Sequence, residues 1–586
     1  MSTKSTLAFF AAMFLFGGLF SQTIELPRFA TDWERQIESP PFLPIGITTP
    51  PSSPVRTMAE WEELQALIIT WSGQTTILTE IVRAARQECM VVICCENQTV
   101  VSQAKTKLTS SGVDFSSNVT FLIAPNNSIW VRDYGPNCVY ANDVDSLYFV
   151  DWIYNRLARP KDDTIATTIA PFFNVPLYST SAAPTDLVNT GGNFMSDGKG
   201  TAFSSELILD ENRIGNPYGV TNKTELEIDN ILLDFMGINE YIKMTPLPYD
   251  DIHHIDMHMK LLDEETLLVG QYPPGVADGP QIEANIQYVL NNFKSAFNTP
   301  YKVVRITMPP ESGQYPNTSG DYRTYANAVF VNKTIIVPFY EQEYDTTAQR
   351  VWQEAMPGYK VVGINCNSII GLSGAIHCIT KEVGVNDPLR IVHQSLQCQD
   401  NSMTSGGYPV YATIQHRSGV SGAKLFYTTD LSTPWQSTDM WQGIIANGDW
   451  FGNIPTQSVG STVYYYIEAI ATNGKTITRP ITAPEGWWKF CVTQSSSTLN
   501  PLADLKEIYP NPASAITVVP VQSSSKTFGN IVVFNSLGQF VQEIYKGEIP
   551  SGNTNYFLDA GNLASGTYFV KLQTAGQLRV KKLVVR

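Results

Sequence analysis

Short hydrophobic runs alternate with amphipathic stretches over the larger part of this chain. Residues 66–71 and 90–95 are apolar runs of strand length, and residues 75–87 between them carry hydrophobic side chains at helical spacing. Similar strand-like runs recur at residues 329–331, 335–338 and 359–364. Because strands and helices alternate in this way, the pattern predicts an α/β domain of repeated strand–helix units over residues 56–386.

The pattern changes near residue 387, after which the helical periodicity ends. Residues 424–428 and 461–469 are rich in β-branched and aromatic side chains, and the sequence TNGK at residues 472–475 is a strong hairpin turn. We therefore expect an immunoglobulin-like β-sandwich over residues 387–493. Cys398 and Cys491 would bracket that domain, and they form the most favourable pair for a structural disulfide.

Four further segments complete the predicted organisation. Residues 1–21 combine a positive start, an apolar run and a small residue at Ser21, as a signal peptide does. Residues 22–55 are rich in proline and have no periodic apolar face, which indicates an extended leader or pro-segment. Residues 494–506 begin with a serine-rich run and are expected to form a linker. Residues 507–586 are expected to form a second, small β-sandwich.

Composition narrows the possible partners and compartments. The 586 residues carry a formal net charge of −15, which argues against nucleic acid as a partner and mildly favours cationic ligands. After residue 21 no apolar run is long enough to cross a membrane, so we expect an exported protein without a transmembrane segment. The eight cysteines have no zinc-like spacing and are too sparse for a disulfide scaffold.

Cys378 is the first candidate for chemistry. It follows the small residues Gly371, Ser373 and Gly374 and precedes a polar run. A loop of small residues can hold a thiol at the mouth of a pocket, whereas an isolated cysteine is more often part of a core. The interpretation of Cys378 therefore depends on what other parts of the chain supply.

Two further motifs supply carboxylates and an imidazole. In WVRDYGP, Asp133 precedes a Gly-Pro turn and lies close to Trp130, so a carboxylate and an indole ring could together hold a planar cation. In HHIDMH, an extended strand would direct His254, Asp256 and His258 to one face. That face could perform proton transfer, or it could ligate zinc or iron.

Asn193 and Asn327 complete the set of candidate residues. Asn193 follows Gly191 and Gly192, and a glycine pair lets the backbone approach a ligand closely, although a turn between strands would use the same residues. Asn327 precedes a predicted strand, where it could serve either a site or a simple turn.

Together, these residues match the requirements of guanidinium hydrolysis. Asp133 and Asp256 would bind the guanidinium by charge-assisted hydrogen bonds while the thiolate of Cys378 attacks its central carbon. His254 would protonate the departing ammonia and then activate the water that cleaves the thiouronium intermediate. The product is a ureido group plus ammonia, and this chemistry needs no metal or organic cofactor.

The chain contains four motifs in a fixed order: WVRDYGP, TGGNFMSD, HID and GAIHCIT. The same order is found in the Porphyromonas-type deiminases. This family includes agmatine deiminases and a secreted bacterial peptidylarginine deiminase. The sequence resembles this family over residues 55–383. The resemblance implies the pentein fold, a propeller of five ββαβ-like units around a central pocket. It gives the catalytic positions to Asp133, His254, Asp256 and Cys378, a supporting position to Asn327 and a pocket wall to Trp130.

The resemblance leaves the substrate open. Residues 151–160 resemble the segment of the secreted enzyme that carries two substrate-binding arginines, but one extra residue separates Arg156 from Arg159 here, so only Arg156 transfers directly. Either arginine could instead form a surface salt bridge. Asp251 is acidic where that enzyme has an aromatic residue, and its charge would favour agmatine or another small guanidine. With Trp130 and Asn193, these three residues form the predicted substrate-binding set.

The C-terminal residues carry a second resemblance. The sequences YPNPAS, GTYFVKL and KKLVV occur in the order seen in the sorting domains of the type IX secretion system. This resemblance implies export to the medium or to the cell surface, with the type IX machinery as a partner. We therefore expect a secreted enzyme that deiminates arginine in peptides, with agmatine deimination as the alternative.

Three other functions fit parts of the pattern. An amidinotransferase-like enzyme on the same fold would pass the amidino group to an amine and release little ammonia. A non-catalytic surface protein would bind guanidinium groups without turnover. A metal hydrolase using His254, Asp256 and His258 would be inhibited by a chelator.

Overall fold

The computed structural model describes residues 25–37, 45–401, 407–443, 448–494, 503–536, 539–574 and 577–586. The chain divides into two compact units. The first contains residues up to 399 together with 404–492, and the second contains residues 400–403 and 493–586. The predicted signal peptide (1–21) lies outside the described residues, as does the central part of the predicted linker.

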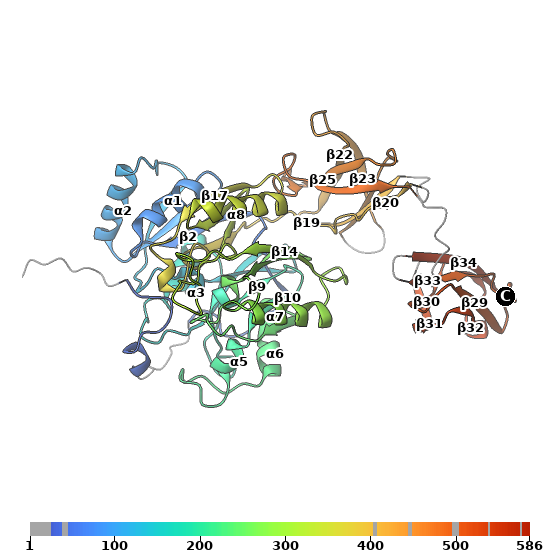
Figure 1. Ribbon diagram of the computed structural model, residues 1–586, viewed down its shortest axis with the longest axis horizontal. Helices are drawn as coiled ribbons and strands as arrows, with labels where there is room; N and C mark the ends of the chain where they lie inside the picture. Colours follow the sequence, from blue (N-terminus) through green and yellow to red (C-terminus); the bar gives the residue numbers. More distant parts are fainter. Residues whose placement is uncertain are drawn as a thin grey trace, which may run out of the picture. The chain divides into compact units, whose positions relative to one another are not determined.

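The first unit contains an α/β region in which one order of strands and helices recurs (Figure 1). In one sheet, β12 (Met259–Asp263) pairs antiparallel with β13 (Thr266–Gln271), and α7 (Gly279–Asn292) then leads to β14 (Lys302–Thr307), which joins β13 in parallel. A second sheet repeats this order with β15 (Val329–Val331), β16 (Thr334–Phe339), α8 (Gln342–Ala355) and β17 (Lys360–Asn365). Helices connect the parallel pairs because parallel strands need a long crossover.

Three more sheets belong to this region. One is formed by β9 (Met195–Ser196), β10 (Thr201–Ser205) and β11 (Glu240–Met244), with α5 (Leu207–Asn212) and α6 (Glu225–Met236) before β11. Another is formed by β1 (Val55–Thr57), β5 (Asn137–Ala141), β6 (Leu147–Tyr154), β7 (Leu177–Thr180) and β8 (Val188–Asn189), with α4 (Ile165–Phe173) before β7. The last is formed by β18 (Lys381–Gly384), β2 (Leu64–Thr70), β3 (Met90–Cys95) and β4 (Val119–Ile123), with the helices α1 (Thr75–Ala85) and α2 (Gln98–Ser110).

The last strand of the α/β region returns to its first sheet. β18 pairs antiparallel with β2, and Lys381 lies opposite Ile68. Because β18 follows directly after Cys378, this pairing fixes the candidate nucleophile beside strands from the beginning of the chain. In Figure 1 the short helix α3 (Val131–Tyr134) lies near the middle of the region, whereas α1, α2, α6, α7 and α8 lie toward its outside.

Burial explains why the predicted runs form these elements. β2 and β3 are buried along nearly their whole length, as expected for parallel strands that are covered on both faces. α1 buries one stripe of side chains that includes Ile77, Leu78, Ile81 and Val82. The predicted helix at residues 75–87 and the strands at 66–71 and 90–95 are confirmed by α1, β2 and β3.

The remainder of the first unit is rich in β-structure, as predicted. Its strands follow the order β19-β21-β24-β23-β22-β25-β27-β20, with β26 beside β25. They are β19 (Arg390–Val392), β20 (Gln399–Asp400), β21 (Tyr408–Gln415), β22 (Val420–Thr428), β23 (Gln436–Gln442), β24 (Asp449–Ile454), β25 (Thr462–Ala471), β26 (Thr476–Arg479) and β27 (Trp488–Thr493). The predicted hairpin at residues 472–475 joins β25 to β26.

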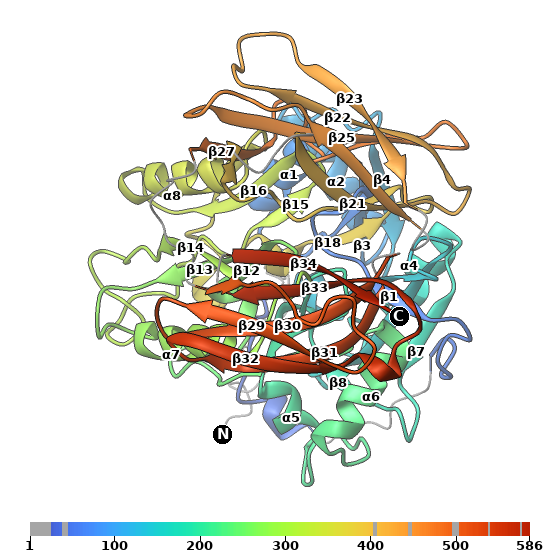
Figure 2. The ribbon, with the colours of Figure 1, turned by 90° about the vertical axis from the view of Figure 1, so that its right-hand side faces the viewer.

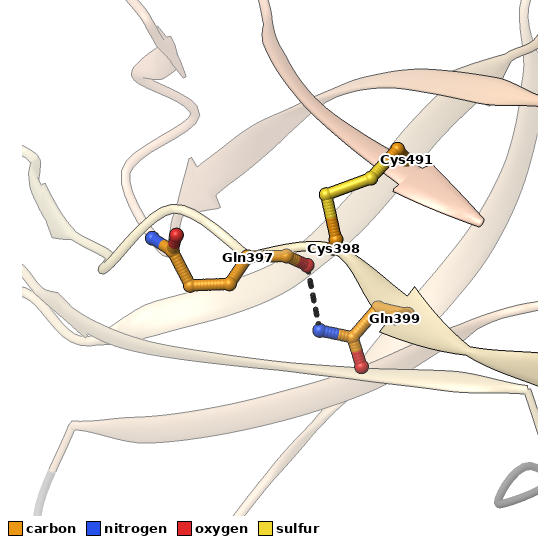
Figure 3. Close-up of a disulfide and its surroundings, with 4 residues drawn as sticks. All are labelled: Gln397, Cys398, Gln399 and Cys491. Atoms are coloured by element: carbon orange, nitrogen blue, oxygen red, sulfur yellow. Dashed lines mark hydrogen bonds between the residues drawn. A yellow bond between two sulfur atoms is a disulfide. The ribbon is translucent and has the colours of Figure 1, made fainter. Parts of the chain in front are cut away.

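A disulfide connects the beginning and the end of this β-rich region. Cys398 and Cys491 are bonded to each other, as the sequence predicts. Figure 3 shows the bond beside Gln397 and Gln399. The side-chain amide of Gln399 donates a hydrogen bond to the main-chain carbonyl of Gln397 at 2.8 Å. The other six cysteines are buried and free, Cys378 among them.

The second unit contains two antiparallel sheets (Figure 2). One has the order β28-β29-β32 and the other β31-β30-β33-β34. The strands are β28 (Ala503–Leu505), β29 (Ile516–Ser523), β30 (Thr527–Asn535), β31 (Phe540–Ile549), β32 (Gly552–Asp559), β33 (Gly566–Thr574) and β34 (Gln577–Val585). β28 falls inside the predicted linker, so that prediction extends too far: Ala503 and Leu505 are buried and belong to the sheet.

Among the described residues, no helix is both long enough and apolar enough to span a membrane.

Candidate active site

A tight turn presents Cys378. The 3-10 helix η4 (Ile370–Leu372) ends at Ser373, which has a positive φ of 66°, and the next 3-10 helix, η5 (His377–Ile379), carries the thiol. A methyl group built on Gly374 would lie 2.5 Å from the Trp130 ring and 3.0 Å from the Cys378 sulfur. The small residues noted in the sequence therefore let the thiol lie close to an indole ring.

Asp133 lies on α3, which is fixed to the Cys378 loop. Arg132 donates hydrogen bonds to both carboxylate oxygens of Glu382, at 2.9 and 2.6 Å, and to the carbonyl of His377 at 3.2 Å. Asp133 itself accepts a hydrogen bond from the backbone N–H of Gly192 at 3.1 Å. The WVRDYGP and TGGN motifs are thereby joined at one carboxylate.

His254 and Asp256 enter the same pocket, although not in the way the sequence suggested. The predicted strand is wrong, because Asp256 lies within the 3-10 helix η3 (Ile255–Met257) and His254 directly precedes that helix. Asp250 accepts the His254 N–H at 2.9 Å. The ring nitrogen Nε2 of His254 lies 3.0 Å from the Thr190 hydroxyl. Side-chain alternation does not apply here, and the turn instead brings both groups inward.

His258 does not join them in a metal site. It is buried, and neither of its ring nitrogens has a hydrogen-bond partner in the structure. No group of three or more His, Cys, Asp or Glu side chains among the described residues is arranged to hold a metal ion. The arrangement of the described residues therefore gives no support to the metal alternative based on His254, Asp256 and His258.

Asn327 contacts the thiol directly. Its amide nitrogen lies 3.2 Å from the Cys378 sulfur and also donates to the carbonyl of Asp256 at 3.2 Å. Its amide oxygen accepts the N–H of His377 at 3.0 Å. Asn327 thus fixes the thiol relative to one of the two carboxylates.

An arginine of the same chain occupies the space between these groups. Arg28 donates to Asp133 from Nε at 2.8 Å and from Nη2 at 2.7 Å. It also lies 3.2 and 3.3 Å from the two carboxylate oxygens of Asp256, and its Nη1 lies 2.6 Å from the sulfur of Cys378. Arg28 is completely buried, so the pocket encloses an arginine side chain between two carboxylates and the thiol.

Gly192 forms the floor beside the guanidinium. A methyl group built on it would lie 1.7 Å from Nη2 of Arg28 and 2.7 Å from Nδ1 of His254. The imidazole and one terminal nitrogen of the guanidinium therefore lie close together against the same side of this glycine. Gly192 therefore lets the backbone lie close to the guanidinium, as the glycine pair in the sequence suggests.

The charges of the pocket support one another. Burial alone would raise the pKa values of Asp133 and Asp256, but the charge of Arg28 outweighs it when combined with the hydrogen bond from Arg28 and the contribution of His254 at Asp133, and with the contributions of His377 and His254 at Asp256. Both carboxyls therefore have lowered pKa values. Burial lowers the pKa of His254 to about 3, with Arg28 acting in the same direction. Burial raises the pKa of the Cys378 thiol, whereas Arg28 opposes that rise. A bound guanidinium thus favours the thiolate and a neutral imidazole.

Four contributors to this site are not among the residues predicted from the sequence, namely His377, Glu60, Lys260 and Arg28. His377 links Asp256 to Glu60, because its two ring nitrogens lie 2.8 Å from Asp256 and 2.9 Å from Glu60. Lys260 also donates to Glu60. His377 could have been suspected because it adjoins Cys378, whereas Glu60 and Arg28 have no local signal in the sequence.

The rim of the pocket binds main-chain atoms. Trp130 donates from its indole N–H to the carbonyl of Leu26 at 2.9 Å, and the N–H of Arg28 donates to the carbonyl of Leu372 at 2.9 Å. Arg156 donates to the carbonyl of Arg28 at 2.8 Å, and Arg159 donates to the carbonyl of Phe29 at 3.1 Å. Trp130, Arg156 and Arg159 therefore all contact the segment that enters the pocket.

Two residues of the predicted substrate-binding set lie elsewhere. Asp251 is exposed, and the buried neighbour Asp250 is the one that faces the interior. Asn193 is buried, but its amide oxygen accepts the N–H of Ser205 at 2.8 Å and its amide nitrogen lies 3.4 Å from the carbonyl of Ser205, so it fixes β10. The structure records no hydrogen bond from Asn193 or Asp251 to Arg28.

The comparison of sequence families agrees with this geometry. The profile described as Porphyromonas-type peptidyl-arginine deiminase matches residues 56–383, which is more than half of the chain. The chain belongs to this family. Asp133, His254, Asp256 and Cys378, which lie around the guanidinium, are all inside the matched part of the chain.

Relatives and solved structures fit the same family. Two curated proteins named "Putative agmatine deiminase" are similar: one from Mycoplasma mycoides is 27% identical over 45% of this chain and 77% of its own length, and one from Yersinia pseudotuberculosis is 26% identical over 46% and 77%. The solved agmatine deiminase of Enterococcus faecalis shares 22% identity and superposes with a TM-score of 0.50 over 58% of this chain and 98% of that one. These structural similarities support an α/β deiminase fold.

The C-terminal residues of the chain match a second profile. Residues 507–586 correspond to the secretion system C-terminal sorting domain, as the sequence resemblance implied. The sorting domain indicates that the protein is exported through the type IX system.

Proposed function

We propose that the protein deiminates arginine residues within polypeptide chains, giving citrulline and ammonia. The observation that carries this proposal is the seat of Arg28, whose guanidinium lies between two carboxylates and 2.6 Å from a thiol. The main chain runs into and out of this seat and is bound on both sides of Arg28. A site specialised for agmatine would have no use for donors aimed at peptide carbonyls.

The proposed reaction uses the groups that surround the guanidinium. Cys378 releases its proton to the neutral His254, and the thiolate attacks the central carbon. The bond from that carbon to one terminal nitrogen breaks, and His254 donates the proton so that ammonia departs. The thiouronium intermediate then reacts with water, from which His254 removes a proton. The carbon–sulfur bond breaks, leaving the ureido product and the free thiol.

The two carboxylates hold the cation throughout the first step. Asp133 and Asp256 together accept four hydrogen bonds from the Arg28 guanidinium in the structure. Such paired contacts fix the plane of the guanidinium as well as its charge. Asn327 and His377 act as positioning residues, because they hold the thiol and Asp256.

We further propose the finer organisation that the sequence suggests. The five sheets of residues 56–386 would be the five blades of a pentein propeller, and residues 387–493 would be an immunoglobulin-like domain. Residues 1–21 would direct the first export step as a signal peptide. The sorting domain at residues 507–586 would then deliver the enzyme to the cell surface or the medium.

A substrate panel tests the proposal. Purified protein is incubated with a peptide containing an internal arginine, a peptide ending in arginine, free arginine and agmatine, and ammonia and ureido product are measured. We expect the internal-arginine peptide to have the highest kcat/KM. A preference for agmatine, the substrate in the names of the relatives, would reject the peptidyl assignment. Amidino transfer to an added amine with little ammonia would reject hydrolysis altogether.

A further inference from the structure

The segment that inserts Arg28 is held at several places besides the guanidinium. At its start, the carboxylate of Glu25 accepts hydrogen bonds from the N–H of Gln74 at 3.0 Å and from the Gln74 side chain at 2.6 Å. A methyl group built on Gly73 would lie 2.6 Å from Glu25, so the surface leaves room for this contact. Residues 25–36, called the N-terminal segment below, therefore begin with an anchor outside the pocket.

A buried ion pair anchors the other end of the N-terminal segment. Glu34, in the 3-10 helix η1 (Glu34–Gln36), lies 2.7 and 3.1 Å from Arg159, and the two side chains are 3% and 0% exposed. Thr31 also donates to Glu34 from its N–H and its hydroxyl, at 2.8 and 2.9 Å. Breaking one half of a buried pair is strongly destabilising, so Arg159 favours retention of this segment.

We propose that the N-terminal segment is an intramolecular inhibitor that keeps the enzyme latent. The inference rests on the proposed function, because Arg28 occupies the position that a substrate arginine must enter. The side chain of Arg28 is fully enclosed, so a second guanidinium has no space beside it. A substrate must first displace the segment.

Displacement is difficult because the anchors act together. The segment leaves only when the contacts of Glu25, Arg28 and Glu34 are all broken. A tethered occupant also has an effective concentration of roughly millimolar, whereas typical KM values are about 1 μM to 1 mM. Competition in cis should therefore reduce the rate on an added peptide by about tenfold or more.

Variants of the full-length protein test this inhibition. We compare wild type with Arg28→Ala, which removes the guanidinium, and Glu34→Ala, which removes the second anchor. Arg35→Ala is the matched control, because Arg35 is exposed and its side chain donates only to the carbonyl of Ala30 within the same segment. Two quantities are measured: the initial rate on an internal-arginine peptide, and the rate at which iodoacetamide labels Cys378, followed by peptide mass spectrometry.

If the N-terminal segment is an inhibitor, the two rates should rise by different amounts in the variants. Arg28→Ala should increase both rates by about tenfold or more, Glu34→Ala should increase them less, and Arg35→Ala should match wild type. Thermal unfolding of each variant shows whether the fold is retained. Equal turnover and equal labelling in wild type and Arg28→Ala would overturn the proposal.

The two readouts separate failure of the inhibitor from failure of the proposed function. If Arg28→Ala is labelled faster but converts no guanidine, the segment covers the thiol and the deiminase assignment fails. If Arg28→Ala and wild type turn over peptides equally and are labelled equally, the deiminase stands and the inhibitor fails. Conversion of Arg28 itself to citrulline in wild type, absent from Cys378→Ala, would make the segment a substrate and would also overturn the inhibitory role.

Discussion

The inner and outer parts of the pocket recognise an arginine in different ways. In the inner part, Asp133, Asp256 and Cys378, each no more than 1% exposed, contact the arginine through its guanidinium group. In the outer part, Arg156 and Arg159 contact carbonyls of the main chain. Every guanidine can use the inner contacts, but only a peptide can use the outer ones. Under the proposed function, the chemistry and the choice of substrate would therefore depend on separate residues.

The largest expected effect is in the inner part, at the nucleophile. Cys378→Ala should lower turnover of peptides and of agmatine by at least about a thousandfold, because no covalent intermediate can form. Ammonia release measures the loss. Cys94→Ala, which alters another buried free cysteine, should retain most of the activity. Retained activity in Cys378→Ala would reject the covalent mechanism.

A carboxylate of the inner part should have the next largest effect. Asp256→Asn removes one charge from the guanidinium seat and alters the contact with His377, which should lower kcat/KM roughly a hundred- to a thousandfold. The loss should be similar for peptides and agmatine. Asp251→Asn is the matched control, and because Asp251 is exposed its kcat/KM should stay within about twofold of wild type. A large effect of Asp251→Asn would restore the sequence-based assignment.

The outer part should show a smaller and selective effect. Arg156→Ala removes one charge-assisted hydrogen bond to the carbonyl that follows the substrate side chain, so kcat/KM for an internal-arginine peptide should fall about tenfold. Agmatine has no such carbonyl, so its kcat/KM should not change when both measurements are made in the Arg28→Ala background, where the guanidinium of the N-terminal segment no longer competes for the pocket. Steady-state kinetics on both substrates measure the difference. An equal loss on both substrates would show that the two parts of the pocket are not separate.

The smallest expected effect concerns stability near the inner part. Burial raises the pKa of Asp250 to about 8, with Asp256 and Asp278 adding to the rise against the opposing influence of Ile252 N–H and Arg28. The folded protein therefore binds a proton that the unfolded chain releases near pH 4, so stability falls as the pH rises toward 8. The slope is at most about 1.4 kcal/mol per pH unit. Asp250→Asn should flatten the fall of the melting temperature between pH 5 and 8; an unchanged slope would contradict this assignment.

The sequence identifies the inner part better than the outer part. Asp133, His254, Asp256 and Cys378 could be selected because each lies in a compact motif whose chemistry fits the others. The route by which two of them reach the pocket could not be predicted, since the alternation expected around His254 gives way to a 3-10 turn held by Asp250. The motifs indicate which side chains could react, but they do not show the backbone conformation that places those side chains in the pocket.

The other parts of the site could not be predicted because they depend on contacts between segments that are far apart in the sequence. Glu60 reaches His377 across the sheet that β2 and β18 share, and Arg28 reaches Asp133 from a segment that has no periodic pattern. Composition identified that segment as a leader, but neither Arg28 nor Arg35 has a local pattern that shows where it binds. Arg156 was selected from the family resemblance, and its main-chain partner became visible only with the fold.

The pairing of β18 with β2 has a consequence for biosynthesis. The ribosome makes Asp133, His254 and Asp256 before it makes Cys378, and the strand that fixes the thiol is the last of the α/β region. Closing this contact joins residues that are far apart in the chain, a slow step in folding. A nascent or truncated chain therefore has carboxylates and an imidazole but no assembled nucleophile. Under the proposed function, the arginines of the producing cell would meet no assembled nucleophile until synthesis has passed residue 384 of 586.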